Sequence, residues 1–301
     1  MSPSAESERC AGGRLTLRVA GDVSRAAARD AARELAERGG RAAGPITLAD
    51  GTDAWWKGAA LSRSGARRHG LARLRGRPAP RLAEFAHLAW LDARLFRVPR
   101  PLFAAALTRR GSLLHQCLAT ERLAEAAPFE VAHARCDGEG ALALASEFGR
   151  ELGRMHALGF LHADVYARNV LVTPPRPERS DTRRLVWIDC WAGGPGHRDH
   201  PLALGKPLAR DLGTWFAAAP LFWSDAEARA ALEAYFGARR VNGRPVLAPR
   251  RCLSAVVRER RRELSRLERD PARLRGAPFP PAGWEPPSGS FPSHDTGAAT
   301  G

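Results

Sequence analysis

The sequence predicts an α+β fold with two lobes, in which the first lobe is rich in strands and the second is helical. Apolar runs separated by turn residues dominate the first half, whereas helical periodicity dominates the second half. A chain of 301 residues is long enough for two lobes. Because the character changes between Leu123 and Pro128, we expect an N-terminal extension with one helix (1–44), a first lobe (45–123), a second lobe (124–275) and a flexible tail (276–301).

An alanine-rich helix is expected near the N-terminus, after the segment "LTLRV" at residues 15–19. The segment "SRAAARDAARELAERGG" has a helical composition, with Asp22 or Ser24 as its N-cap and Gly39 as its stop. Because the apolar face of this segment is mostly alanine, we expect the helix to pack shallowly on its neighbour.

Strands and one helix are expected to make up the first lobe. The segment "PITLADGTDAWWKGAAL", residues 45–61, indicates two short strands around an Asp-Gly turn, with Lys57 on the second strand. An arginine-rich connector follows, and Pro80 then opens a helix that carries Glu84 in its first turns. Residues 102–123 contain two apolar runs around an Arg-Arg-Gly turn, which predicts a hairpin.

The second lobe is expected to begin with a long helix in "ALALASEFGRELGRMHALGF", residues 141–160. Two short strands, "NVLVT" and "RLVWID", flank a polar insert that we interpret as a loop. Further helices are expected in residues 209–223, 224–240 and 251–269. From Gly276 onward the chain is rich in Pro, Gly and Ser, which is typical of a flexible tail.

The segment "HADVYARNVLV" contains the most specific pattern in the chain. The only asparagines are Asn169 and Asn242, and the first of them lies five positions after Asp164, just before an apolar run. Chance alone would produce the spacing His-x-Asp-x-x-x-x-Asn roughly 0.003 times in a chain of this composition. The pattern therefore marks a candidate functional loop.

Lysine is rare in this basic chain, which gives Lys57 added weight. Lys and Arg total 47 residues, yet Lys57 and Lys206 are the only lysines. Where a positive charge is sufficient the chain uses arginine, so the lysine in "DAWWKGAAL" indicates a need for a compact ammonium group. The formal net charge of +15 itself has two interpretations that stay open: binding of anions, or a nucleotide-composition bias toward arginine.

The order of these residues resembles that of the protein-kinase fold: a lysine on a strand, a glutamate on the next helix, the His-x-Asp-x-x-x-x-Asn loop, and an aspartate after a later strand. Within that superfamily, "LGFLHADVYARNVLV" followed by "RLVWIDCWAG" is most similar to the lipopolysaccharide core kinases, which phosphorylate Kdo or heptose sugars of the inner core. The resemblance covers the chain from Trp55 to Phe216. It implies a protein-kinase-like fold and an ATP-dependent phosphotransferase with a hydroxyl group as acceptor.

The resemblance implies a nucleotide site in the first lobe. Lys57 would contact the α- and β-phosphates of ATP, and Glu84 would form an ion pair with Lys57. The segment "LATERL" would be the hinge between the lobes, where backbone groups from Glu121 to Leu123 meet the adenine.

The catalytic and metal-binding residues are implied in the second lobe. Asp164 would orient the acceptor hydroxyl and accept its proton. Asn169 and Asp189 would bind Mg²⁺, which prefers oxygen ligands. Asp211, in "RDLGTW", would brace the loop that carries the catalytic aspartate, and a helix cap is the alternative for this residue.

The chain departs from the kinase pattern at several positions. No G-x-G-x-x-G precedes Lys57, where Gly44 and Gly51 occur instead, so the phosphate-covering loop has no assignment. Ala163 stands before the catalytic aspartate, and Cys190 follows the metal-binding aspartate in place of Phe-Gly. The sequence also lacks a recognisable A-P-E segment, which argues against a protein kinase regulated by phosphorylation of its activation loop.

The location expected for the protein is the cytoplasm. Five cysteines form no C-x-x-C pair, which favours a reducing compartment. The N-terminus lacks the layout of a signal peptide, and no apolar run approaches ~18 residues. Residues 251–269 combine an apolar face with many arginines, so this helix either packs as a terminal helix with a solvated face or rests on anionic lipid at the inner face of the cytoplasmic membrane.

Three alternatives to a lipopolysaccharide kinase stay open on the sequence alone. The acceptor could be a protein or a small molecule on the same fold, or the chain could be a kinase-like binding module without catalysis. Nucleic acid is not expected as a partner, because no basic motif with interleaved aromatic residues occurs. In "GHRDH", His197 and His200 have the character of metal ligands, but an exposed loop is the preferred interpretation.

Overall fold

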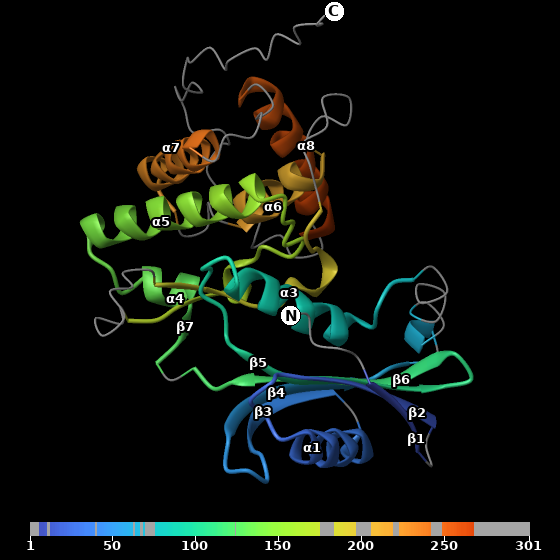
Figure 1. Cartoon of the computed structure of the whole chain (residues 1–301). Helices are drawn as coiled ribbons and strands as arrows, with labels where there is room; N and C mark the ends of the chain where they lie inside the picture. Colours follow the sequence, from blue (N-terminus) through green and yellow to red (C-terminus); the bar gives the residue numbers. More distant parts are fainter. Residues whose placement is uncertain are drawn as a thin grey trace, which may run out of the picture. The chain divides into compact units, whose positions relative to one another are not determined.

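The structure is a computed structural model that describes residues 6–10, 13–39, 41–62, 64–66, 69, 76–123, 125–174, 184–196, 206–218, 223–241 and 249–267. The chain divides into two compact units: Met1–Pro128 with Asn169–Gly194, and Phe129–Arg168 with Pro195–Gly301. Two β-sheets lie in the first unit, and four long helices lie in the second (Figure 1). The predicted α+β architecture, with a strand-rich first part and a helical second part, is confirmed. The domain limits given above stay a prediction.

A six-stranded antiparallel sheet forms the framework of the first unit, in the order β1-β2-β5-β6-β4-β3. Its strands are β1 (Glu6–Cys10), β2 (Gly13–Val19), β3 (Arg41–Thr47), β4 (Asp53–Ala60), β5 (Pro101–Arg109) and β6 (Ser112–Glu121). The strands expected on both sides of the Asp-Gly turn and in the hairpin are confirmed. Neither β1 nor β2 was predicted, and β3 begins four residues earlier than Pro45. A proline is tolerated in β3 because this strand lies at an edge of the sheet.

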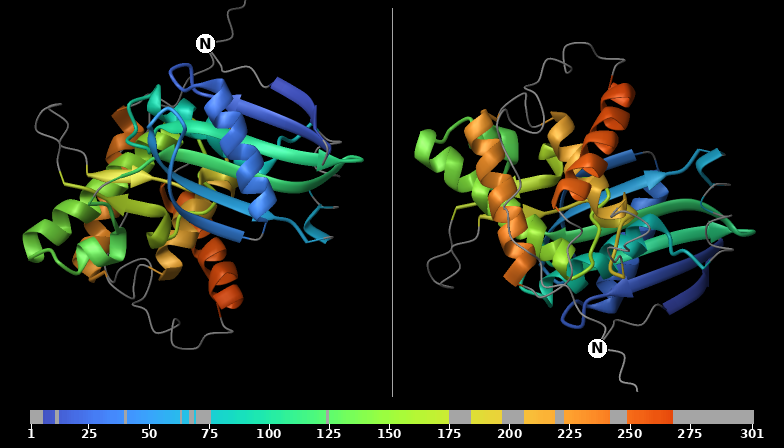
Figure 2. Two further views of the ribbon diagram at one scale, coloured as in Figure 1. Left: turned by 90° about the horizontal axis from the view of Figure 1, so that it is seen from below. Right: turned by 90° about the horizontal axis from the view of Figure 1, so that it is seen from above.

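Helix α1 (Arg25–Arg38) covers one face of the sheet, as Figure 2 (left) shows. The predicted caps are confirmed, since Ala27 N donates to Ser24 Oγ at 3.4 Å and Gly39 ends the helix with φ 62°. Side chains alternate along β4, so Ala54 and Trp56 join the apolar core beneath α1. The same alternation directs Lys57 to the opposite face.

Helix α3 (Pro80–Asp92) covers that opposite face (Figure 1). Pro80 occupies the first turn as predicted, and Gln116 of β6 takes the place of a capping side chain, because its Oε1 accepts a hydrogen bond from Arg81 N at 3.1 Å. Phe85 and Leu88 are buried. Glu84 lies on the same buried side of the helix with no exposed surface, so it requires charged or polar partners.

A small three-stranded sheet completes the first unit. It consists of β7 (Ala127–Pro128), β8 (Val170–Val172) and β9 (Leu185–Trp187), all antiparallel, followed by the short helix η3 (Cys190–Ala192). The two strands expected around the polar insert are confirmed as β8 and β9. Ile188 N donates to Asn169 O at 3.1 Å, so the residues just outside β8 and β9 lie opposite each other.

The second unit is helical, as predicted. Its helices are α4 (Phe129–His133), α5 (Gly138–Ala157), α6 (Lys206–Ala218), α7 (Asp225–Val241) and α8 (Pro249–Leu267), and the short helix η1 (Ala167–Asn169) lies at the junction with the first unit. Gly149 and Gly153 let α5 approach α7 closely, because a Cβ at these positions would lie 1.9 Å and 2.5 Å from carbonyl oxygens of α7. Aromatic rings fill the core, with Phe148 stacked on Trp215 at 3.8 Å. None of the helices in the described residues is long and apolar enough to cross a bilayer.

Candidate active site

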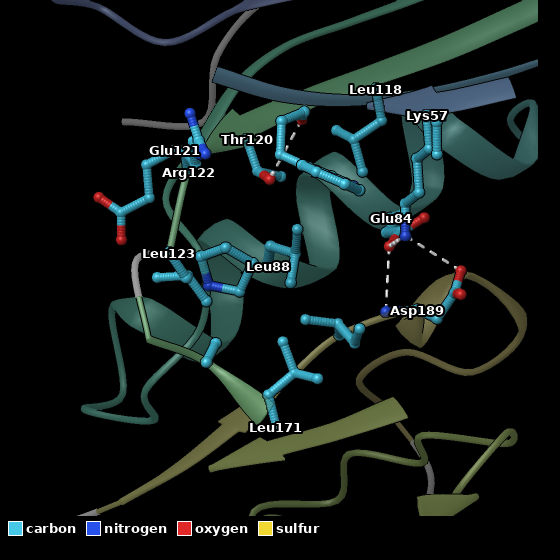
Figure 3. Close-up of a pocket in the computed structure, with 15 residues that line it drawn as sticks. Lys57, Glu84, Leu88, Leu118, Thr120, Glu121, Arg122, Leu123, Leu171 and Asp189 are labelled. Carbon is cyan, nitrogen blue, oxygen red and sulfur yellow. Dashed lines mark hydrogen bonds and ion pairs between the residues drawn. The ribbon is translucent and has the colours of Figure 1, made fainter. Parts of the chain in front are cut away.

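Lys57 and Glu84 form an ion pair on the face of the six-stranded sheet that α3 covers. Lys57 Nζ donates to Glu84 Oε1 at 2.6 Å. The pair forms because the alternation of β4 and the buried face of α3 direct the two side chains toward each other (Figure 3). The Glu84 carboxylate is 1% exposed, so this pairing compensates a charge that would otherwise be buried alone.

Arg81 is a second cation at this site. It was not predicted from the sequence. It lies one turn before Glu84 on α3, and its NH1 donates to Glu84 Oε2 at 2.5 Å and to Asp189 Oδ1 at 3.0 Å. Burial alone would lower the pKa of Arg81, but the charges of Glu84 and Asp189 outweigh burial and raise it. The only sequence signal for Arg81 is its spacing of three residues from Glu84 on a predicted helix.

Asp189 completes the cluster at the end of β9. Its Oδ1 accepts from Lys57 Nζ at 3.1 Å, and its backbone N donates to Glu84 Oε1 at 3.1 Å. Burial alone would raise the pKa of the Asp189 carboxyl group, but the positive charges of Lys57 and Arg81 outweigh burial and lower it to about 2. Asp189 has φ 61°, a left-handed conformation that aspartate tolerates better than most residues.

The segment after Asp189 is also held by α3. His87, one turn beyond Glu84, donates from Nδ1 to the carbonyl oxygen of Cys190 at 2.8 Å. Gly194 lies so close to His87 that an added Cβ would come within 2.6 Å of the imidazole ring. Helix α3 therefore positions Asp189, the metal-binding candidate, in two ways: through the ion cluster and through the hydrogen bond from His87 to the backbone of Cys190.

A cavity of about 500 Å³ opens beside the cluster, and all of its lining residues belong to the first unit. One end carries Lys57, Glu84 and Asp189, and the middle is lined by apolar side chains that include Trp55, Leu118 and Leu171. The polar residues Thr120, Glu121 and Arg122 also line the cavity. Trp55 lies two positions before Lys57 on the same face of β4 and is 44% exposed. Neither Gly44 nor Gly51 is among the described residues that line the cavity, and the phosphate-covering loop stays without an assignment.

The predicted hinge residues line the cavity at the end away from Lys57. Glu121, the last residue of β6, is paired with Ala54 of β4, and Leu123 follows two residues later. In Figure 3 the Glu121 carboxylate points away from the other labelled side chains. The geometry therefore leaves the backbone of this segment, rather than the Glu121 side chain, to meet a ligand in the cavity.

Asn169 lies opposite the residue before Asp189, because Ile188 N donates to its carbonyl oxygen. It is 3% exposed and is not among the residues that line the cavity. An amide and an ionised carboxylate are both oxygen ligands that suit Mg²⁺. The described residues contain no group of three or more His, Cys, Asp or Glu side chains that could hold a metal ion.

Asp164 lies in the second unit, on a loop whose backbone donates hydrogen bonds to a buried aspartate. Asp211 of α6 is fully buried and accepts hydrogen bonds from the backbone N of His162 and of Ala163, both at 2.8 Å. Ala163 adopts φ 68°, a strained conformation for a residue with a side chain. The two bonds from Asp211 hold this strained turn immediately before Asp164, which is the bracing role expected for this residue.

A buried chain of hydrogen bonds extends the support of the loop. His156 of α5 contacts Asp211 Oδ2 through Nε2 at 3.1 Å and the Tyr235 hydroxyl through Nδ1 at 2.8 Å. Arg239 NH1 donates to the same hydroxyl at 2.9 Å. A neutral His156 protonated on Nε2 satisfies the whole chain, since it donates to Asp211 and accepts from Tyr235. The sequence analysis did not identify His156, which lies within a regular helical pattern.

The structure brings five of the seven predicted site residues together around one cavity: Lys57, Glu84, Glu121, Leu123 and Asp189. Asn169 lies beside this group through its backbone, and Asp164 belongs to the other unit. The roles of all seven stay predictions. His197 and His200 lie outside the described residues.

Comparisons with known proteins give a family and a fold. The model of the lipopolysaccharide kinase (Kdo/WaaP) family matches residues 26–192, which is more than half of the chain. Among solved structures, WaaP in complex with acyl carrier protein matches with a TM-score of 0.50 and 19% identity, over 86% of this chain and 99% of that one. A Toxoplasma gondii specific rhoptry antigen kinase domain matches with a TM-score of 0.36 and 13% identity, over 89% of this chain and 88% of that one. No curated protein sequence matches the chain.

Proposed function

The chain belongs to the lipopolysaccharide kinase (Kdo/WaaP) family and is a kinase, and from this premise we propose that it transfers the γ-phosphoryl group of ATP to a hydroxyl group of a Kdo or heptose sugar in the lipopolysaccharide inner core. The observation that carries the proposal is the ion cluster of Lys57, Glu84 and Asp189 at one end of a cavity that Trp55, Leu118 and Leu171 line with apolar surface. Such a cavity suits a flat apolar base at one end and phosphates at the other.

ATP would bind in this cavity with its base between Trp55, Leu118 and Leu171. The exposed face of Trp55 offers a surface on which a base can stack. The phosphates would reach Lys57, whose charge is fixed in place by Glu84. Arg81 would add a second positive charge at the same end, since it is held one turn before Glu84.

Asn169 and Asp189 are the residues that would hold Mg²⁺. Both provide oxygen atoms, and Asp189 stays ionised at neutral pH because its pKa is lowered to about 2. The ion, when bound, would neutralise negative charge on the phosphates. Lys57 and Arg81 already lie within hydrogen-bonding distance of Asp189, so the chain keeps this carboxylate ionised before any ligand arrives.

Asp164 would act on the acceptor. It would orient the sugar hydroxyl and accept its proton, and Asp211 would keep the loop in the required conformation through the backbone of the two preceding residues. The half-buried side chain of Asp164 retains access for an acceptor.

Two measurements test the proposal. Calorimetric titration with ATP, with and without Mg²⁺, should give tight binding that depends on the metal. ATP consumption should then increase with a Kdo-containing or heptose-containing inner-core acceptor, and not with a generic protein substrate. Transfer to protein or to a small soluble alcohol alone would instead support the rival acceptors, and binding of ATP with no transfer to any acceptor would contradict the proposal.

The location and partners proposed follow from the acceptor. A lipid-linked acceptor places the work of the enzyme at the inner face of the cytoplasmic membrane, and the net charge of +15 favours contact with an anionic surface. The solved WaaP structure contains acyl carrier protein, so a protein partner is a second candidate.

A further inference from the structure

Arg168 occupies a position on the catalytic loop that the proposed mechanism does not use. It lies four residues after Asp164, in the short helix η1. Its neighbours Ala167 and Asn169 are buried, whereas Arg168 is exposed. A single exposed residue within a buried turn, so close along the chain to the proposed base, is placed to meet the acceptor rather than to support the fold.

The guanidinium group of Arg168 is held in one place by an aromatic ring. Its Cζ lies 4.3 Å from the centroid of the Tyr166 ring, within the range of a cation–π contact. Such stacking uses the face of the guanidinium plane and leaves its N–H groups, which point outward in that plane, available to a ligand.

The Tyr166 ring is itself fixed at both ends. Its hydroxyl group donates to the carboxylate of Glu263 on α8, which is 7% exposed. Its backbone N donates to the carbonyl oxygen of Asp164 at 2.9 Å. Tyr166, on whose ring Arg168 stacks, is therefore hydrogen-bonded directly to the backbone of Asp164, the proposed base.

Arg168 differs from two other arginines of this unit, which are paired with carboxylates. Arg154 pairs with Glu151 and Arg262 pairs with Glu259. Among the described residues, no carboxylate pairs with Arg168. A positioned guanidinium group with open N–H donors is the arrangement that proteins use for bidentate recognition of carboxylate or phosphate.

We propose that Arg168, positioned by Tyr166 and Glu263, binds an anionic group on the acceptor, so that the enzyme selects sugars that carry a carboxylate or a phosphate near the hydroxyl it phosphorylates. This inference rests on the proposed function, and it identifies the class of acceptor. A carboxylate and a phosphate would use the same donors, and the probes below separate these two sources.

Binding of four sugar probes, measured by calorimetry without any transfer step, tests the proposal. The probes form two pairs that differ in charge: Kdo as the free acid and as its methyl ester, and heptose phosphate and heptose. The wild-type protein should prefer the anionic member of at least one pair by about tenfold or more. A preference in the Kdo pair alone identifies a carboxylate, and a preference in the heptose pair alone identifies a phosphate.

Variants test whether that preference depends on Arg168 and Tyr166. Arg168→Gln should abolish it, and Arg168→Lys should retain part of it, because lysine keeps the charge but not the planar fork. Tyr166→Leu should weaken it by removing the ring on which Arg168 stacks. Arg150→Gln, which removes an exposed arginine from α5 in the same unit, should behave as the wild type does. Thermal unfolding of each variant checks that the loop is still folded.

Two results would overturn the inference: equal binding of charged and neutral probes by the wild type, or an unchanged preference in Arg168→Gln. Phosphoryl transfer to the same probes is measured separately. If the wild type transfers to none of them, the proposed function fails, while the binding ratios still decide the role of Arg168. If transfer occurs, Arg168→Gln should raise KM for the anionic probe and leave kcat within about twofold.

Discussion

The ion cluster of the first unit and Asp211 of the second unit rely mainly on different kinds of hydrogen-bond donor. In the first unit, Glu84 and Asp189 are paired with the side chains of Lys57 and Arg81 at the edge of an open cavity. In the second unit, the fully buried Asp211 accepts hydrogen bonds from two backbone N–H groups and from a buried histidine.

This difference indicates what each group can do. Long cationic side chains can change partner when a charged ligand arrives, because they have rotatable stems and an exit to the cavity. Backbone donors cannot move without unfolding the turn to which they belong. We infer that the first unit is built to exchange its partners for phosphates, and that the second is built to keep one loop conformation.

The largest expected effect separates chemistry from binding. Asp164→Asn should lower kcat by about 10³-fold, because it removes the group proposed to orient the hydroxyl and accept its proton. Its affinity for ATP with Mg²⁺ should stay within about twofold of the wild type, since the nucleotide cavity lies wholly in the first unit. Steady-state kinetics and calorimetry measure the two quantities.

Lys57→Met is the complementary variant to Asp164→Asn, because it should weaken nucleotide binding itself by about tenfold or more. If Asp164→Asn lost ATP affinity and turnover to the same extent, the division of roles between the two units would be wrong.

The next effect concerns the stability of the second unit. Asp211→Ala leaves two backbone N–H groups and His156 without their acceptor in a buried site, so it should lower the free energy of unfolding by about 3 kcal/mol. Asp211→Asn should lower it less, because one oxygen remains to accept. Urea unfolding followed by tryptophan fluorescence measures both variants. A loss below about 1 kcal/mol for Asp211→Ala would show that the loop does not depend on this support.

The sequence predicted most of the framework because its signals are local. Pro80 at a helix start, Ser24 and Gly39 as caps, and the turns between apolar runs each depend on neighbouring residues. Strand β1 was missed because its polar segment "ESERC" has no strand pattern and becomes a strand by pairing with β2. The role of Gly149 could not be predicted either, since a glycine in a strong helix gains its purpose from another helix far along the chain.

At the candidate site, sequence analysis finds residues of a rare type and misses residues of an abundant type. Lys57 and Asn169 were found because lysine and asparagine are rare in this chain. Arg81 was missed because arginine is abundant here, so that one more arginine gives no contrast until its contacts are known. A contact made across the sheet or between helices is not encoded in local spacing.

A smaller effect is expected from pH, and it tests whether cationic side chains keep Asp189 ionised. The pKa of Asp189 is lowered from 3.8 to about 2 in the folded protein, so its ionised form adds stability that is complete above about pH 4 and is lost as the pH falls toward 2. The shift corresponds to a contribution on the order of 2 kcal/mol. The stability difference between the wild type and Asp189→Asn should therefore shrink over this range.

Asp22→Asn is the control for loss of a surface carboxylate, since Asp22 is 63% exposed in its pair with Arg100. Urea titrations at several pH values between 5 and 2 measure all three proteins. A stability difference between wild type and Asp189→Asn that stays constant over this range would mean that Lys57 and Arg81 do not stabilise the charge.

The smallest effect concerns arginines of α8 that, unlike Arg81 of the ion cluster, are exposed. Arg258, Arg261 and Arg262 are exposed at spacings that place them on one side of the helix, whereas the half-buried Arg260 donates from Nε to the carbonyl oxygen of Phe216. Arg260 is therefore a structural residue and is left out of the variant.

Changing Arg258, Arg261 and Arg262 to Gln should weaken binding to vesicles that carry phosphorylated glycolipid by about tenfold at low ionic strength, and less at high ionic strength, where the charges are screened. The matched control changes Arg109, Arg110 and Arg150, which are also exposed, and so removes the same charge from other surfaces. Co-sedimentation with anionic and neutral vesicles measures the three proteins. A loss that is equal in both triple variants would mean that net charge alone drives binding. No binding by the wild type at low salt would instead favour a soluble acceptor and the composition-bias interpretation of the arginine excess.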